Sequence, residues 1–245
     1  MQTLDITTRD GVCPAYVHRP DGDGPWPAVL MLMDGPGIRP ALQDLAERLA
    51  QQGYYVLLPD LFYRSGPYAP IDVSVVWTNQ ALREEHRETL MAPATPAKVM
   101  SDMPAFLDVL AHSPEVEPGS VGVVGYCMGG RLALIAAGTY PDRIAAAASY
   151  HGGGLANDTP SSPHLLAAKM KAKVYVGGAT DDANFPDEMK ARLEAALTDA
   201  SVDHCIETYP AKHGWVPADM PVHDKAEAEH HWRTLVPFMD SVLKT

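Results

Sequence analysis

Nucleophilic chemistry is suggested most clearly by one short segment, Gly125-Tyr126-Cys127-Met128-Gly129-Gly130. It follows an apolar run at residues 121–124 and precedes an apolar segment of helical character at residues 131–137. A nucleophile flanked by glycines between a strand and a helix is typical of a nucleophile elbow, with cysteine in the position that serine more often occupies. The helix N-terminus beneath such a side chain favours negative charge, so we expect Cys127 to be the nucleophile.

The same segment has two other interpretations. A free cysteine is often simply buried in a turn, which would make Cys127 structural. A glycine-rich loop can also cradle phosphates, but the glycines here do not fit G-x-G-x-x-G, and no P-loop lysine follows. The sequence therefore disfavours nucleotide binding and leaves a structural cysteine as the alternative.

A cysteine nucleophile needs a base and a group that orients this base, and both are found after later apolar runs. Asp181 and Asp182 follow the run at residues 174–176, and His213 follows the run at residues 205–209. Ligands bind at the carboxyl ends of strands in open α/β sheets, so these loops are expected to meet. We predict His213 as the base. We prefer Asp182 as the acid because its spacing to the next proline fits D-x-x-x-P, with Asp181 as the alternative.

The elements that would position these side chains alternate along the chain. Apolar runs typical of strands buried on both faces occur at residues 28–33, 54–58, 121–124, 144–150, 174–176 and 205–209. Apolar stripes of helical period lie within residues 42–49, 99–110, 186–197 and 232–243. This alternation predicts an α/β fold, a doubly wound, mostly parallel sheet with helices on both faces. Residues 3–19 are expected to add an antiparallel hairpin at one edge.

Domain organisation follows from length and from one irregular segment. We predict a single domain over residues 1–245, a usual length for one α/β domain. A charged, partly aromatic insertion around residues 65–92 is interpreted either as a lid over the site or as a solvated surface helix. Thr95 followed by Pro96 predicts the start of the next helix, and Pro237 is expected to kink the last one or to remove a hydrogen bond.

Composition and charge exclude several classes of function. The 245 residues carry a formal net charge of −12, and no cluster of basic residues offsets it, which argues against nucleic-acid partners. No apolar run approaches the length of a membrane helix, and the N-terminus lacks the pattern of a secretory signal. Three cysteines without a CxxC pair argue against a disulfide framework and fit the reducing cytoplasm.

Several titratable residues near the C-terminus have spacings that could present metal ligands on one helix face: His223, Glu227, His230 and His231. No second group of ligands accompanies them, so we interpret them as a solvated helix face. We therefore expect no metal and no cofactor. The expected partner is a small molecule, bound by a monomer or a small homo-oligomer.

The combined motifs resemble those of the dienelactone hydrolase family. The resemblance rests on the cysteine elbow at residues 125–130, on an acid after the run at residues 174–176, and on His213-Gly214 near the C-terminus. Pro-Asp-Leu-Phe-Tyr-Arg at residues 59–64 and Met-Asp-Gly-Pro-Gly at residues 33–37 are also similar. The resemblance extends over almost the whole chain and implies the α/β-hydrolase fold.

Roles for individual residues follow from this resemblance. Cys127 would be the nucleophile, His213 the base and Asp182 the orienting acid. The backbone N–H groups of Met128 and Gly35 would form the oxyanion hole. These positions agree with the usual donors, one after the nucleophile and one after the first central strand.

Two positions depart from the family pattern. Family members carry a glutamate at the position of Asp34, where it governs the resting state of the thiol, and the aspartate is one methylene shorter. Dienelactone-type enzymes hold the substrate carboxylate with arginines, one of them a few residues after the histidine. That stretch has no arginine here and begins with Trp215, which suggests a more apolar pocket. Arg83 or Arg87 is the match considered for the other arginine.

Together these observations predict a hydrolase of the dienelactone hydrolase, or carboxymethylenebutenolidase, type. It would cleave a carboxylic ester or lactone through a Cys-His-Asp triad and a thioester acyl-enzyme. Thiolates expel amines poorly, so esters, lactones or thioesters are expected ahead of peptides. Acyl transfer on the same triad and a non-catalytic ligand-binding protein are the alternatives, because a fold does not fix a function.

Overall fold

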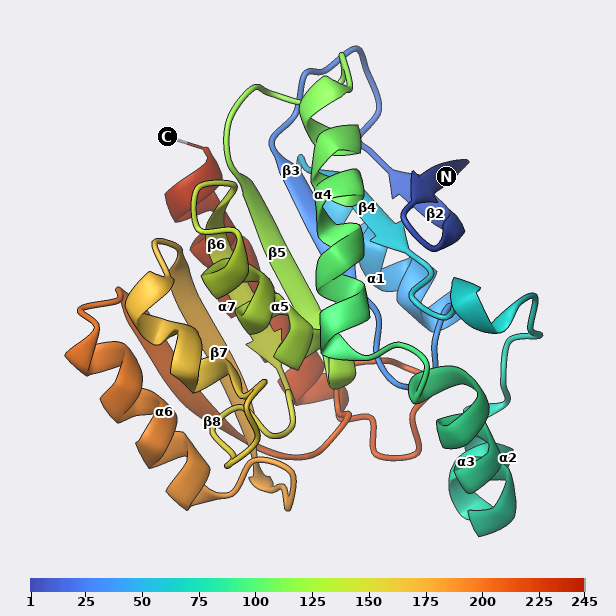
Figure 1. Ribbon diagram of the computed structural model, residues 1–245, viewed down its shortest axis with the longest axis vertical. Coiled ribbons are helices and arrows are strands. Elements are labelled where there is room, and N and C mark those ends of the chain that lie inside the picture. Colours follow the sequence, from blue (N-terminus) through green and yellow to red (C-terminus); the bar gives the residue numbers. More distant parts are fainter. Residues whose placement is uncertain (245) are drawn as a thin grey trace.

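The computed structural model describes residues 1–244 and is built around one eight-stranded sheet (Figure 1). The strand order is β1-β2-β4-β3-β5-β6-β7-β8, and all neighbours from β4 to β8 are parallel. The strands are β1 Gln2–Thr8, β2 Gly11–His18, β3 Ala28–Leu32, β4 Tyr55–Pro59, β5 Val121–Tyr126, β6 Ile144–Tyr150, β7 Lys173–Asp181 and β8 His204–Lys212. The predicted mostly parallel sheet is therefore confirmed, with the N-terminal hairpin antiparallel at one edge.

Helices cover both faces of the sheet, as the alternating pattern predicts. Figure 1 shows α4, α5 and α6 on one face and α1 and α7 on the other. Their bounds are α1 Pro40–Ala50, α4 Pro96–His112, α5 Met128–Thr139, α6 Asp187–Asp199 and α7 Lys225–Leu243. The central strands β3, β4 and β5 are buried along their whole length, which explains their unbroken apolar runs.

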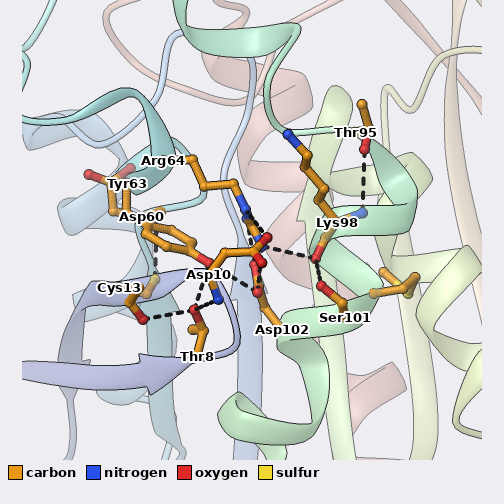
Figure 2. A network of polar contacts seen from close by, with 12 residues as sticks. Thr8, Asp10, Cys13, Asp60, Tyr63, Arg64, Thr95, Lys98, Ser101 and Asp102 are labelled. Carbon is orange, nitrogen blue, oxygen red and sulfur yellow. Dashed lines mark hydrogen bonds and ion pairs between the residues drawn. The ribbon is translucent and has the colours of Figure 1, made fainter.

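A network of polar side chains fastens the N-terminal hairpin to the body of the protein (Figure 2). Arg64 donates two hydrogen bonds to the fully buried carboxylate of Asp102 in α4, at 2.7 and 2.8 Å, and one to Asp10 in the hairpin turn, at 2.8 Å. The Tyr63 hydroxyl also donates to Asp102, at 3.0 Å. Cys13 of β2 is buried beside this network, and burial is the main cause that raises the pKa of its thiol.

The charged insertion contains short helices that project from the body at the lower right of Figure 1. They are α2 Val73–Thr78, α3 Gln80–His86 and a π-helical turn, Arg87–Met91. Each α-helix begins at a side-chain cap: Asp72 accepts from the N–H groups of residues 74 and 75, and Asn79 accepts from that of Leu82. Most of the segment is exposed, but Val73 and His86 are buried against the body.

Local expectations for the other helices are met in part. Thr95 accepts a hydrogen bond from the Lys98 N–H at 3.3 Å and so caps α4 as predicted. Helix α7 continues through Pro237 from Lys225 to Leu243. The interpretation of His223, Glu227, His230 and His231 as one solvated helix face is wrong at two positions. His223 lies before α7, and His231 is fully buried, 3.0 Å from the Tyr126 hydroxyl. Among residues 1–244, no helix is long and apolar enough to cross a membrane.

Candidate active site

Three side chains from separate loops meet at the carboxyl edge of the sheet. Cys127 directly follows β5, Asp182 directly follows β7, and His213 directly follows β8. The Nε2 atom of His213 lies 3.1 Å from Cys127 Sγ, and its Nδ1 atom donates to Asp182 Oδ2 at 2.7 Å. The structure thus brings together the three residues that the sequence singled out as nucleophile, base and acid.

Asp182, and not Asp181, contacts the histidine because of where β7 ends. Asp181 is the last residue of β7 and is exposed, whereas Asp182 turns inward and its carboxylate is fully buried. The Asn184 N–H donates to Asp182 Oδ1 at 2.9 Å, which fixes the carboxylate from its other side. Burial would raise the pKa of Asp182, but its hydrogen bonds to His213 and Asn184 outweigh this and lower it.

The electrostatic state of His213 follows from the same contacts. Burial alone would lower the pKa of this imidazole. The hydrogen bonds to Asp182 and Cys127 outweigh burial and raise the pKa to about 10. This raised pKa favours the protonated form of His213 at neutral pH. A positive imidazolium beside the sulfur favours a negative charge there.

The backbone at Cys127 is strained in the way a nucleophile elbow requires. Its φ is 52° and its ψ is −112°, a conformation that side chains other than glycine rarely adopt. The Cys127 N–H lies 3.0 Å from His151 Nδ1 and 3.0 Å from the Tyr150 carbonyl oxygen. Two acceptors on β6 and just beyond it thus hold the turn that presents the thiol.

Glycines beside the cysteine allow the close backbone contacts of this turn. A Cβ atom on Gly125 would lie 2.0 Å from the carbonyl oxygen of Gly129, and one on Gly129 would lie 2.1 Å from the carbonyl oxygen of Leu32. Such distances are impossible for any residue with a side chain. The first turn of α5 therefore packs backbone against backbone on the end of β3.

The loop after β3 reaches the same edge of the sheet. Asp34 and Pro36 line the cavity beside Cys127, and Gly35 lies between them. Within residues 1–244, neither the Gly35 N–H nor the Met128 N–H donates a hydrogen bond to another residue. Both amides are therefore available to a ligand, as an oxyanion hole requires.

Asp34 does not approach the thiol as a free carboxylate but forms a buried ion pair. Arg39 donates to both of its oxygens, at 2.6 and 3.0 Å, and to Asp219 through two further bonds at 2.6 and 3.0 Å. Arg39 and Asp34 are each 2% exposed. Arg39 also donates to the Gly37 carbonyl at 3.1 Å, so the pair holds the loop that carries Gly35.

The cavity above Cys127 has a volume of about 310 Å³. Much of its wall is apolar and comes from Pro36, Trp77, Met91, Met128 and Met220. Trp77 and Met91 belong to the insertion, which therefore forms one wall of the cavity. A second hollow of about 410 Å³ is lined by Thr180, Asp181, Lys212 and His223 but not by Cys127.

A model of the dienelactone hydrolase family matches residues 13–243. The chain belongs to the dienelactone hydrolase family. A relative from Methylorubrum extorquens, provisionally named a carboxymethylenebutenolidase, is 30% identical over 239 residues, which are 95% of this chain and 78% of the relative. The carboxymethylenebutenolidase of Pseudomonas putida is 32% identical over 176 residues, or 71% of this chain and 70% of that protein.

Solved structures agree on the fold. A provisionally assigned dienelactone hydrolase from Klebsiella pneumoniae superposes with a TM-score of 0.84 at 24% sequence identity, and the match covers 97% of both chains. The predicted α/β-hydrolase fold is therefore confirmed. Together with the family match, these relatives make the chain a hydrolase of the dienelactone hydrolase type.

Three of the residues considered for the site, Arg83, Arg87 and Trp215, do not line the cavity of this dienelactone hydrolase family member. Arg83 is exposed on α3, and its Nη1 donates to the Trp77 carbonyl at 3.2 Å. Trp215 is fully buried behind the cavity wall, where it stacks on Tyr209 and meets the His151 ring edge-on at a centroid distance of 5.0 Å.

Two residues that do line the cavity were not assigned a role from sequence. Arg131 lies in the first turn of α5, and His151 follows β6 and is fully buried. The sequence signals were present: Arg131 stands directly after the elbow glycines, and His151 directly follows a buried strand. Within residues 1–244, no cluster of three or more His, Cys, Asp or Glu side chains is placed to hold a metal ion.

Proposed function

We propose that the protein hydrolyses a carboxylic ester or lactone through Cys127, His213 and Asp182, with a thioester acyl-enzyme. The single observation that carries this proposal is the continuous chain of contacts from Cys127 Sγ through His213 to Asp182, at 3.1 and 2.7 Å, at the base of a cavity. The family membership and the relatives named as carboxymethylenebutenolidases support the same class of reaction.

Acylation begins with attack by the Cys127 thiolate. Its sulfur forms a bond to the carbonyl carbon, and the π electron pair moves onto the carbonyl oxygen. The amides of Gly35 and Met128 stabilise this oxyanion, with about 3 kcal/mol expected from each donor. The C–O bond to the leaving group then breaks, and the leaving oxygen takes the proton of His213.

Deacylation reverses the roles of the same groups. Neutral His213 accepts a proton from a water molecule, whose oxygen attacks the thioester carbon. The C–S bond breaks, the carboxylic acid is released, and the thiolate again faces a protonated imidazole. Asp182 keeps the Nδ1 proton in place throughout, so that Nε2 is the atom that gives and takes the proton.

The experiment that tests this proposal is rapid mixing of the protein with a short-chain aryl ester, followed by acid quenching and intact-mass analysis. We expect a burst of the phenol equal in amount to the protein, with one acyl group that maps to Cys127. The buried Cys13 and the exposed Cys205 are internal controls and should stay unmodified. An adduct on Cys205 alone, or turnover that survives complete alkylation of Cys127, would contradict the mechanism.

The same assay distinguishes hydrolysis from acyl transfer. Faster acyl release with an added alcohol would favour acyl transfer.

The position and surroundings of Arg131 favour a substrate that carries a negative charge. Its Nη2 donates only to neutral oxygens of Thr159 and Ser161, and its Nε is buried without a partner among the described residues. Burial lowers the pKa of Arg131, and no neighbouring carboxylate opposes this effect. A guanidinium that lines the cavity without an acidic partner fits a substrate carboxylate, and the name carboxymethylenebutenolidase of the relatives describes such a group.

Replacing Arg131 with methionine is expected to discriminate between charged and neutral substrates. For an ester with a carboxylate on its acyl part, KM should rise about 10-fold or more, because one charge-assisted hydrogen bond is lost. For the matched methyl-capped ester, KM should change less than about 3-fold. Arg192→Met serves as the control, since that arginine pairs with Asp158 outside the cavity. Equal changes for both esters would refute the role of Arg131.

A further inference from the structure

The insertion does more than wall the cavity, because one of its side chains reaches the loop that carries Gly35. His86, the last residue of α3, is only 6% exposed. Its Nε2 atom lies 2.7 Å from the Gly35 carbonyl oxygen. A carbonyl can only accept, so Nε2 carries the proton and donates it. The contact joins residues 51 positions apart in the chain.

Aromatic neighbours fix the imidazole that makes this contact. Phe62, after β4, meets the His86 ring edge-on with a centroid distance of 5.9 Å. Trp77, in α2, meets it from the insertion with a centroid distance of 6.2 Å and also lines the cavity. The His86 ring therefore packs between Phe62 of the main domain and Trp77 of the insertion.

Gly35 is a position in its loop where the backbone needs such a restraint. It has no side chain, so both of its dihedral angles are soft. On its N-terminal side, Asp34 is held by the Arg39 ion pair and by the Gly37 N–H, which donates to the Asp34 carbonyl at 3.1 Å. On its C-terminal side the next residue is Pro36, which has no N–H. The Gly35 carbonyl is thus the one hydrogen-bonding group of that peptide.

We propose that His86 is a positioning residue for the oxyanion hole: it holds the carbonyl of the Gly35–Pro36 peptide and so fixes the C-terminal side of Gly35. The neighbouring Asp34–Gly35 peptide, whose carbonyl accepts from the Gly37 N–H, can then present the Gly35 N–H to the carbonyl oxygen of the substrate. This inference rests on the proposed function. It also means that the insertion must be seated for the oxyanion hole to be complete, because His86 ends α3. Met91 completes the arrangement, since its methyl carbon lies 3.0 Å from the position that a Cβ of Gly35 would occupy.

The test compares two reactions of the same thiol in single-turnover measurements. Acylation by an aryl ester passes through an oxyanion, whereas alkylation by iodoacetamide at a saturated carbon does not. We expect His86→Leu to slow acylation of Cys127 by about 30-fold or more, because loss of one oxyanion donor costs 10²- to 10³-fold and displacement of it costs somewhat less. Alkylation should stay within about 2-fold of the unchanged protein.

Rescue and control variants separate positioning from general damage to the fold. His86→Gln retains an N–H donor at nearly the same reach and should restore acylation to within about 5-fold. Glu85→Ala changes an exposed neighbour on the same helix and should leave both rates unchanged. If His86→Leu does not fold, His86→Asn takes its place, because its shorter amide cannot reach the Gly35 carbonyl.

Three outcomes would overturn the inference. Unchanged acylation in His86→Leu would show that the contact does not serve the reaction. An equal loss of acylation and alkylation, or a failure of His86→Gln to restore acylation, would mean that His86 acts only through packing. In each of these cases the unchanged protein is still acylated at Cys127, so the proposed function stands. Absence of acylation in the unchanged protein itself would overturn both.

Discussion

Replacing Cys127 with alanine is expected to lower kcat/KM for an aryl ester by about 10⁴-fold or more. The thiol is the group that would form the covalent bond, and among the described cysteines Cys127 is the one that contacts His213. The amides of Gly35 and Met128 would remain, so a small residual rate above that of water is expected. Steady-state hydrolysis measured with substrate below KM gives the ratio directly.

A serine at the same position makes the comparison more informative. Cys127→Ser preserves the shape of the elbow but offers a hydroxyl that must lose its proton during attack. We expect a loss of about 10²-fold or more, because a hydroxyl is far less acidic than a thiol and must transfer its proton to His213 as it attacks. Cys205→Ala is the matched control and should retain full activity. If Cys127→Ala kept more than about a tenth of the rate, Cys127 would not be the nucleophile.

The second large effect is expected on stability. Replacing Arg39 with methionine should lower the free energy of unfolding by about 3–5 kcal/mol, because it leaves the buried Asp34 carboxylate without a partner. Burial alone would lower the pKa of Arg39, and its two carboxylate partners outweigh this effect and raise it. Urea denaturation should show a lower midpoint with an unchanged slope.

A double variant distinguishes a lost charge partner from lost packing. Asp34→Leu combined with Arg39→Met removes both buried charges, and we expect it to recover most of the stability, since apolar replacement of a buried pair is often neutral or favourable. Arg143→Met is the control: its partner Asp108 is 55% exposed, and the loss should stay below about 1 kcal/mol. A double variant as unstable as Arg39→Met would indicate that the pair acts through packing against Gly37 and Asp219.

Local patterns in the sequence predicted the strands of the sheet well. The run at residues 144–150 coincides with β6, because a strand buried on both faces has no polar alternation to obscure it. The choice between Asp181 and Asp182 depended on where β7 ends. Neighbouring residues at the end of a strand point in opposite directions, so a shift of one residue exchanges an exposed carboxylate for a buried one.

The parts that sequence reasoning did not reach are contacts between distant segments. Arg39 and Asp219 are 180 residues apart, and His86 and Gly35 are 51 apart, so no local pattern connects them. His231 carries a polar side chain on a helix with an exposed face, yet it lies fully buried beside the Tyr126 hydroxyl. Rules based on propensity or spacing assign such residues to the solvent-exposed surface. They use only the residue type, and not the distant residues that form hydrogen bonds with it in the folded protein.

The close backbone contact between Gly129 and the end of β3 has a consequence for how this enzyme could change over generations or by design. Because main-chain atoms meet there, no residue with a side chain can replace Gly129 without moving the elbow away from the end of β3. Substitutions that adapt the cavity to new substrates are therefore expected in the wall formed by the insertion. Trp77 and Met91 stand on an exposed segment, where replacements leave the sheet untouched. His86 is the exception, because it contacts Gly35. Exchange of residues 73–91 with His86 retained is therefore the natural unit for libraries that seek a different acyl group.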